Sequence, residues 1–373
     1  MKKVFFALVA AAFGLGLLTA YVGCAPKEKT REIMNVSYDP TRELYEDYNQ
    51  LFIKHWLEKT GETVAVEKSN GGSRGQARAV VSGMDADVVT LALASDVDLV
   101  AQAHLFSEGA EDPNSPNYWQ KRLPNNSCPY VSTIVLLVRK GNPKNVKGWD
   151  DLLRDDVKVV TPNPNTSGGA CWNYLAIWGH ALDKALAEDG GIDAFIAGTV
   201  PREKVDAAQQ AAYEFTKKVF KNATRQGMQS GARGATDDFV KNGNGDAFIA
   251  WENEAMLAKK YSNNELEIVV PALTIKAEPP VAVVDAVADR KGNRDIAEEY
   301  LKFLYEPEAQ ELIAKRFYRP SDPNVLEKHK SEFPETKLFT IDEVFGGWFK
   351  AQEEHFGSTG FYDKMTLEIA QQQ

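Results

Sequence analysis

The sequence has few of the residues on which most enzymes and metal sites depend. Its 373 residues include 3 cysteines and 5 histidines. The histidines are scattered along the chain, at His55, His104, His180, His329 and His355, and HExxH, GxSxG and P-loop motifs are missing. A hydrolase or transferase needs a nucleophile with a base, or a metal cluster. The sequence therefore disfavours an enzyme, and we expect neither a metal nor a cofactor.

Positive charge is also in short supply. The chain has 43 Lys and Arg against 53 Asp and Glu, which gives a formal net charge of -10. This balance argues against binding to nucleic acid or to an anionic membrane surface. An acidic protein that captures an anion must do so with local dipoles rather than with its overall electrostatic field.

Long hydrophobic runs are confined to the N-terminus. Residues 1–3 (Met-Lys-Lys) precede an apolar stretch over residues 4–18, which is typical of an export signal spanning 1–23. The Val-Gly-Cys that ends at Cys24 is similar to the end of a bacterial lipobox, so we expect acylation of Cys24 and a tether over 24–31. An uncleaved anchor is the alternative, because the run approaches the length of a spanning helix. The mature protein is expected outside the cytoplasm, in the periplasm or on the outer face of the cytoplasmic membrane.

The two other cysteines, Cys128 and Cys171, are far apart in the sequence and match no zinc or CxxC spacing. In an oxidising compartment they can pair, whereas in a reducing one they are small buried side chains. We expect a disulfide between them, with two free thiols as the alternative.

The pattern beyond the leader predicts two α/β lobes. Roughly 350 residues remain, more than one hydrophobic core usually organises, and apolar strands alternate with amphipathic helices. The predicted strands cover residues 33–37, 63–67, 87–92, 132–139, 157–161, 246–250, 267–270 and 281–287. A proline-bracketed loop at 124–129 and the Glu-Pro-Pro at 278–280 are the predicted crossings between lobes. Lobe I would then hold residues 32–127 and 280–373, and lobe II residues 128–279.

The clearest predicted helix follows the first strand. Apolar residues recur at helical spacing over 44–56, with Asp39 as the expected N-cap and Gly61 as the stop. His55 lies on the apolar face, so we interpret it as a core residue rather than a ligand. The C-terminal third is also helical and is expected to close lobe I.

Four short segments lie where a predicted strand ends and a helix begins. They are residues 37–42 (SYDPTR), 70–75 (NGGSRG), 165–170 (NTSGGA) and 230–234 (SGARG). A helix N-terminus exposes unpaired N–H groups and about half a positive charge, glycine allows close approach and serine adds a hydroxyl donor. One such loop is usually only a turn. Four in one chain predict an oxyanion site, because ligands of α/β proteins bind at the carboxyl ends of the strands.

Longer motifs carry a family resemblance. They are residues 36–45 (VSYDPTRELY), 167–170 (SGGA), 230–234, 249–254 (IAWENE) and 338–348 (LFTIDEVFGGW). Over about Glu32 to Gln352 the chain resembles the periplasmic sulfate-binding protein family. The resemblance implies a two-lobed, hinge-closing periplasmic binding protein of type II that feeds sulfate or thiosulfate to an ABC importer. The implied partners are that anion and the membrane permease, with the protein itself a monomer.

The resemblance also implies the residues that hold the anion. They are backbone N–H donors at Asp39, Gly168, Gly169 and Ala232, hydroxyl donors at Ser73 and Ser167, and the indole N–H of Trp251. Trp251 comes from the resemblance alone, with a strand-end core aromatic as the alternative. Two departures bear on affinity: Asn70 stands where the family often has His, and Cys171 where it often has Arg. Arg233 is the remaining candidate for a cation behind the anion, with a solvated surface arginine as its alternative.

The donor set favours an anion without a proton. Sulfate accepts hydrogen bonds only, whereas hydrogen phosphate keeps a proton that would be buried without an acceptor. Asp39 is the only carboxylate among these residues, and we expect it to cap its own helix. An inward-pointing Asp39 would favour phosphate instead. Thiosulfate, molybdate and tungstate stay open as alternatives.

Overall fold

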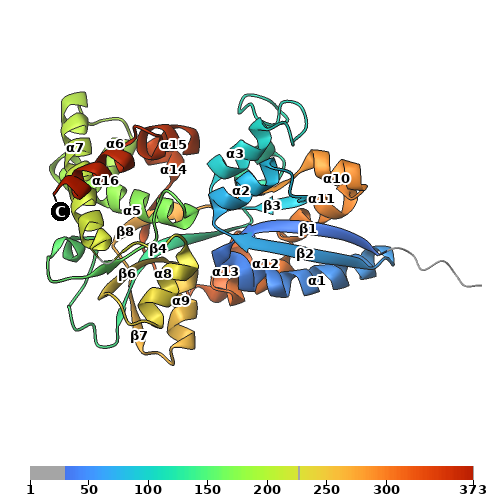
Figure 1. Ribbon diagram of the computed structural model, residues 1–373, viewed down its shortest axis with the longest axis horizontal. Helices are drawn as coiled ribbons and strands as arrows, with labels where there is room; N and C mark the ends of the chain where they lie inside the picture. Colours follow the sequence, from blue (N-terminus) through green and yellow to red (C-terminus); the bar gives the residue numbers. More distant parts are fainter. Residues whose placement is uncertain (1–29, 226, 373) are drawn as a thin grey trace, which may run out of the picture.

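A computed structural model describes residues 30–225 and 227–372. Two α/β lobes lie side by side, each with its own sheet flanked by helices (Figure 1), so the predicted fold class is confirmed. The predicted export signal over 1–23 and the lipidation residue Cys24 lie outside the described residues.

Lobe I is built on a four-stranded sheet in the order β2-β1-β3-β9, in which only β9 runs antiparallel to its neighbour. Its strands are β1 (Arg31–Tyr38), β2 (Val64–Gly71), β3 (Val88–Thr90) and β9 (Val281–Val283). Its helices are η1 (Asp39–Thr41), α1 (Arg42–Thr60), α2 (Ser73–Val81), α3 (Ala94–Gln102), η2 (Trp119–Lys121), α4 (Pro124–Ser127), α10 (Asp285–Lys291), α11 (Arg294–Phe303), α12 (Pro307–Lys315) and α13 (Pro323–His329).

Lobe II is built around β4, which pairs with four other strands of a seven-stranded sheet. The strands are β4 (Tyr130–Arg139), β5 (Val159–Val160), β6 (Ala247–Trp251), β7 (Leu266–Val269), β8 (Leu273–Ala277), β10 (Arg319–Pro320) and β11 (Lys337–Phe339). The helices are η3 (Trp149–Leu153), α5 (Gly168–Ala185), η4 (Ala187–Asp189), α6 (Gly191–Ile196), α7 (Arg202–Thr224), α8 (Ala232–Val240), α9 (Glu252–Tyr261), α14 (Ile341–Phe345), α15 (Trp348–Phe356) and α16 (Phe361–Gln371).

Each predicted strand overlaps a strand of the structure. The last one, predicted over 281–287, is shorter, because β9 ends at Val283 and α10 begins at Asp285. β8, β10 and β11 were not predicted, and two of them are only two or three residues long.

The C-terminal segment corrects the predicted lobe boundaries. β11 pairs in parallel with β8 of the lobe II sheet, and α16 packs against α7. Residues 337–371 therefore lie in lobe II, although they were expected to close lobe I. Phe339 fills the space beside Gly179 of α5, where an added Cβ would overlap its ring. The chain thus enters lobe II again beyond α12, first at β10 and then at β11, in addition to the predicted crossings near 124–129 and 278–280.

The helix after β1 agrees with the prediction at its end and differs at its start. Gly61 ends α1 in the left-handed conformation, with φ of 78°. Asp39 is not an N-cap: Tyr38 is the N-cap of η1 and Thr41 that of α1, and neither makes a side-chain capping bond. Asp39 Oδ1 instead accepts a hydrogen bond from Arg42 Nη2 at 3.0 Å, because η1 already starts at Asp39. His55 stacks on Phe303, with ring centroids 4.0 Å apart, but it is only partly buried and its Nε2 bonds with Glu299 Oε1 at 2.7 Å, so it lies at the edge of the core rather than within it.

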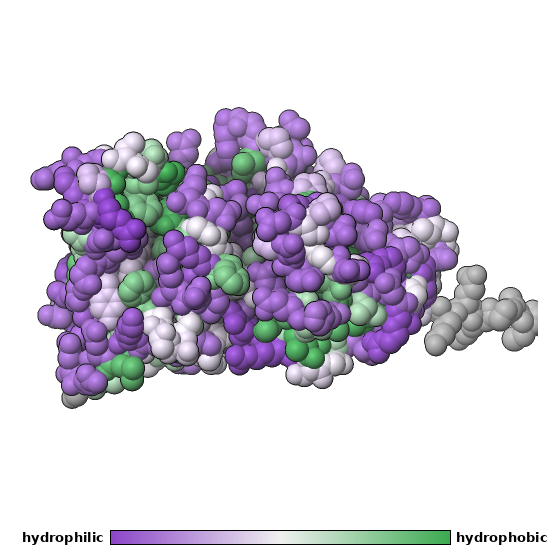
Figure 2. Space-filling view, turned by 90° about the horizontal axis from the view of Figure 1, so that it is seen from above, coloured by the Kyte–Doolittle hydropathy of each residue, from purple (hydrophilic) through white to green (hydrophobic). Residues whose placement is uncertain are grey.

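Hydrophilic residues dominate the face in Figure 2, and hydrophobic residues form small patches among them. Across the described ranges, no helix is both long enough and apolar enough to span a bilayer.

Candidate anion-binding site

The structure brings the four predicted strand-to-helix junctions together between the lobes. η1 and α2 of lobe I pack against α8 and α5 of lobe II, respectively. A Cβ added at Gly231, just before α8, would lie 3.8 Å from Asp39 Oδ2. A Cβ added at Gly72, just before α2, would lie 2.9 Å from the carbonyl oxygen of Thr166. Glycine at these positions lets the starts of the four helices converge.

The start of α5 lies at the centre of this cluster. Ser167 is the N-cap and makes no side-chain capping bond, and Gly168 and Gly169 are the first two helical residues. All three are buried. A Cβ at Gly168 would lie 3.0 Å from both Ala92 Cβ and Ser73 Cβ of lobe I. Because the first N–H groups of a helix have no acceptor within it, the predicted donors of α5 stand where an anion can use them.

α8 contributes the second helix start from lobe II. Ala232 is its first residue and is 8% exposed. Arg233, the next residue, donates from Nη2 to Glu43 Oε1 at 2.8 Å and lies 3.9 Å from Glu254 Oε1. Glu43 belongs to α1 of lobe I. Arg233 therefore pairs with a carboxylate of the other lobe, and its side chain is 35% exposed.

Ser73, the first residue of α2, has a hydroxyl group that is already engaged. Its Oγ donates to Asp96 Oδ2 at 2.5 Å and accepts from the Ala92 N–H at 3.0 Å. Asp96 also accepts from Arg74 Nε. Burial raises the pKa of Asp96, and the nearby Arg74 opposes that shift. The sequence had suggested that Asp39 is the only carboxylate of the cluster. The structure adds a second one, Asp96.

Asp96 is the residue that the sequence analysis missed. It lies in the first turn of α3, which is a fifth junction after a buried strand. This junction has neither the glycines of 70–75, 165–170 and 230–234 nor the proline of 37–42, so the signals that found the other four did not apply. Its position directly after the apolar run of 88–94 could have indicated it.

Trp251 ends β6 and is 2% exposed. Its Nε1 donates to the carbonyl oxygen of Gly169 at 3.1 Å, and its ring packs against Tyr38 with centroids 5.5 Å apart. The indole therefore joins both lobes at the predicted site, with its N–H directed at the first turn of α5.

The two departures from the family pattern lie beside the cluster. Asn70 is in β2, and its side-chain nitrogen is buried without a hydrogen-bond partner among the described residues. Cys171 is inside α5, where its Sγ donates to the Pro164 carbonyl at 3.3 Å. Cys128 lies at the first crossing and donates to the Glu278 carbonyl at 3.5 Å. Both thiols are free, so the predicted disulfide is not formed: each cysteine is held in a different part of the molecule.

Further hydrogen bonds hold the lobes together around the cluster. Trp172 Nε1 of lobe II donates to the Ala92 carbonyl of lobe I at 2.9 Å. Arg74 Nη2 of lobe I donates to Gln352 Oε1 of α15 at 2.7 Å. Together with the ion pair between Arg233 and Glu43, these contacts hold the two lobes in a closed conformation.

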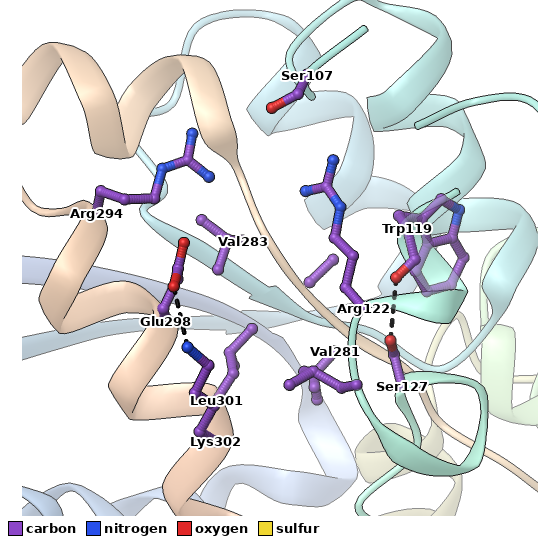
Figure 3. Close-up of a pocket in the computed structure, with 12 residues that line it drawn as sticks. Ser107, Trp119, Arg122, Ser127, Val281, Val283, Arg294, Glu298, Leu301 and Lys302 are labelled. Carbon is purple, nitrogen blue, oxygen red and sulfur yellow. Dashed lines mark hydrogen bonds and ion pairs between the residues drawn. The ribbon is translucent and has the colours of Figure 1, made fainter. Parts of the chain in front are cut away.

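A separate pocket in lobe I differs from this cluster in its chemistry. It has a volume of about 320 Å³ and an apolar floor that includes Val281 and Val283 (Figure 3). Asp285 accepts a hydrogen bond from Arg122 at 2.7 Å and another from Arg294, and Lys302 donates to Glu298 at 3.0 Å, so all three cations that line this pocket are paired with carboxylates. None of the predicted anion-binding residues lines it. In the part of the chain that the structure describes, no group of three or more His, Cys, Asp or Glu is placed to hold a metal ion.

Comparisons with known proteins agree with the geometry. The family described as bacterial extracellular solute-binding protein matches residues 36–319. The sulfate-binding protein of Escherichia coli is 48% identical over 355 residues, which cover 95% of this chain and 98% of that protein. The thiosulfate-binding protein of Pseudomonas aeruginosa is 39% identical over 366 residues, which cover 98% of this chain and 99% of that protein.

Among solved structures, the sulfate-binding protein SubI from Mycobacterium tuberculosis is similar with a TM-score of 0.69 and 29% identity. The match covers 86% of this chain and 98% of that one. The structural similarity confirms the predicted two-lobed fold of type II periplasmic binding proteins.

Proposed function

Because this chain belongs to the bacterial extracellular solute-binding proteins, and among them to the sulfate-binding protein family, we propose that it captures sulfate between its lobes and delivers it to an ABC importer. The observation that carries the proposal is the convergence of four strand-to-helix junctions on one buried place. Such a place offers N–H and O–H donors together with the positive ends of helix dipoles. An acidic protein can hold an anion there without a net positive charge.

The proposed donors are the seven groups that the sequence indicates. They are the backbone N–H groups of Asp39, Gly168, Gly169 and Ala232, the hydroxyl groups of Ser73 and Ser167, and the indole N–H of Trp251. Two of them, the Ser73 hydroxyl and the Trp251 N–H, are bonded to Asp96 and to the Gly169 carbonyl and must turn to the anion as it binds. At about 1.5 to 3 kcal/mol each, they amount to roughly 10 to 20 kcal/mol before any cost is subtracted. Most of this offsets the dehydration of a dianion and the ordering of the lobes. A micromolar or tighter affinity, about -8 kcal/mol or beyond, is what remains.

Selectivity against phosphate follows from the two carboxylates at the site. The Asp39 carboxylate accepts from Arg42, and the buried Asp96 accepts from Ser73 and Arg74. Asp39 Oδ1 is turned to Arg42, and Asp96 lies behind the Ser73 Oγ to which it is bonded, so neither carboxylate is presented to the proton of hydrogen phosphate. A buried O–H without an acceptor costs about 1 to 3 kcal/mol, so sulfate binds preferentially.

Thiosulfate is the second candidate, favoured by the similarity to a thiosulfate-binding protein. It differs from sulfate by one larger and softer atom, and the same donors can hold its oxygens.

The proposal also covers the location of the protein in the cell and its macromolecular partner. The protein is a transport component without catalytic activity. It acts as a monomer outside the cytoplasm, in the periplasm or on the outer face of the cytoplasmic membrane, and is held there by a lipid on Cys24. Its macromolecular partner is the membrane permease of the importer.

Calorimetric titration of the protein lacking residues 1–24 with sulfate, thiosulfate, molybdate and phosphate tests this proposal. We expect micromolar or tighter binding of sulfate and no comparable heat with phosphate. Tight phosphate binding without a response to sulfate would contradict the proposal. Turnover of a sulfate ester that is lost in Ser167→Ala would show an enzyme instead.

A further inference from the structure

Arg74 lies directly behind the proposed site and is not among the expected donors to the anion. It is the second residue of α2, and its side chain is 26% exposed. Nε donates to the buried carboxylate of Asp96, and Nη2 donates to Gln352 of lobe II at 2.7 Å. The side chain therefore contacts the group to which Ser73 is bonded, and it also reaches the other lobe.

Ser73 has one hydroxyl proton, and two acceptors compete for it. Its Oγ accepts from the Ala92 N–H at 3.0 Å, so the proton points to Asp96 Oδ2 at 2.5 Å. A hydroxyl group cannot donate to Asp96 and to a bound anion at the same time. Ser73 becomes a donor to the anion only when Asp96 gives up this bond.

Asp96 can give up that bond only if its charge stays compensated. The side chain is 0% exposed, and a buried carboxylate without a partner is strongly destabilised. Of its two side-chain donors, Arg74 is the charged one, and it stays paired when Ser73 turns away. Cys171 of α5, which borders the same cavity of about 230 Å³ as Arg74, is a thiol and supplies no charge.

From this geometry we infer that Arg74 is a positioning residue: by holding the charge of Asp96, it releases the Ser73 proton to the bound anion and so sets the affinity of the site. The inference rests on the proposed function and adds to it a residue outside the expected donor set. Arg74 acts through Asp96 and Ser73, without contact with the anion.

Comparing four proteins by calorimetric titration with sulfate tests this: the wild type, Arg74→Ala, Ser73→Ala and the double variant. Each single change should weaken binding roughly 10- to 150-fold, the range for one hydrogen bond to a charged group. The double variant should bind about as weakly as Arg74→Ala alone, because Ser73 stays bonded to Asp96 once Arg74 is gone. Losses that multiply in the double variant, or an unchanged affinity of Arg74→Ala, would overturn the inference.

Arg78 provides the matched control. It lies one turn further along α2, lines the same cavity and is exposed, but it makes no hydrogen bond to Asp96. Arg78→Ala should keep the wild-type affinity within about threefold, since surface charges act weakly. A loss as large as that of Arg74→Ala would assign the effect to the general positive field and contradict the inference.

Asp96→Asn removes the negative charge of residue 96 and keeps a side chain of nearly the same size and shape. An asparagine can turn its amide group toward Ser73 Oγ, which leaves the hydroxyl proton free, and its oxygen toward Arg74. In this background Arg74→Ala should cost less than about threefold in affinity. A purely structural role of Arg74 would not be rescued by removing the charge of Asp96, and an unrescued double variant with a normal melting temperature would therefore overturn the inference.

Gln352→Ala tests whether Arg74 acts through closure instead. It removes the bond between lobes and leaves Arg74 on Asp96, so we expect a loss of less than about threefold, as for other half-exposed contacts. A loss equal to that of Arg74→Ala would assign the effect to closure. A wild type that does not bind sulfate would contradict the proposed function, whereas a wild type that binds, with Arg74→Ala unaffected, would contradict this inference alone.

Discussion

The two lobes contribute differently to the same site. Lobe II presents backbone N–H groups at the starts of α5 and α8, which helix geometry fixes in place. In lobe I, the Ser73 hydroxyl is bonded to Asp96 and the Asp39 carboxylate to Arg42. One half of the site is therefore preset by the backbone. The other half depends on the balance of charges behind it.

Closure of lobe I onto the start of α5 and the indole N–H of Trp251 give the two largest expected effects. In Gly168→Ala, the new Cβ would lie 3.0 Å from Ala92 Cβ and Ser73 Cβ, so the lobes cannot approach fully. Overpacking of this kind costs about 1 to 3 kcal/mol. We expect calorimetry to show a roughly 5- to 150-fold weaker sulfate affinity.

Gly75→Ala is the control for this change. Gly75 lies in α2, and an added Cβ meets nothing within 4 Å. Its sulfate affinity should equal that of the wild type. Equal affinities of the two alanine variants would place the anion away from the contact between α5 and α2, and the comparison of the lobes would fail.

Trp251→Phe removes the indole N–H and keeps an aromatic ring. If Trp251 donates to the anion, affinity falls roughly 10- to 150-fold, as for a hydrogen bond to a charged group. Trp149→Phe is the matched control, because Trp149 Nε1 also donates to a carbonyl in lobe II, that of Leu273, at 3.0 Å. Both variants should lose thermal stability, and only Trp251→Phe should lose affinity. Equal affinities would show that Trp251 is a core aromatic.

The sequence was sufficient for the features that local chemistry specifies. The four junctions are marked by glycine, serine or proline at strand ends. These residues determine the backbone conformation of the segment in which they lie, so their effect can be predicted without knowing distant contacts. The apolar runs indicated eight strands for the same reason. Ser167, Gly168 and Gly169 could thus be predicted as a helix start before any contact was known.

Pairings between distant segments could not be predicted. Arg74 and Asp96 are 22 positions apart, and Arg74 and Gln352 are 278 apart, so no spacing rule connects them. The three residues of β11 give little signal, and the position of the segment after them depends on which sheet β11 joins. Likewise, the pairing of Cys128 with Cys171 depended on a distance in space that the sequence does not contain.

The ion pair between Arg233 and Glu43 gives a smaller expected effect. It joins α8 to α1 at 2.8 Å, and its side chains are 35% and 23% exposed. A pair of this exposure contributes about 0.2 to 1 kcal/mol, so Glu43→Gln should weaken sulfate binding by less than about fivefold. Glu46→Gln is the control, because Glu46 pairs with Lys68 inside lobe I. Affinity measured at low and high sodium chloride should change less in Glu43→Gln than in Glu46→Gln, and an equal salt response would contradict a role in closure.

Asp39→Asn is expected to have the smallest effect and bears on selectivity. The carboxylate is bonded to Arg42 at 3.0 Å, whereas the proposed donor is the backbone N–H, which the substitution keeps. Competition between sulfate and phosphate should therefore give the same preference in the variant and the wild type. If the carboxylate faced the anion and accepted a proton from it, the wild type would bind phosphate and Asp39→Asn would lose that binding, because a buried phosphate hydroxyl would be left without its acceptor. An unchanged preference would locate the rejection of phosphate in the donor-only set, most of which belongs to lobe II.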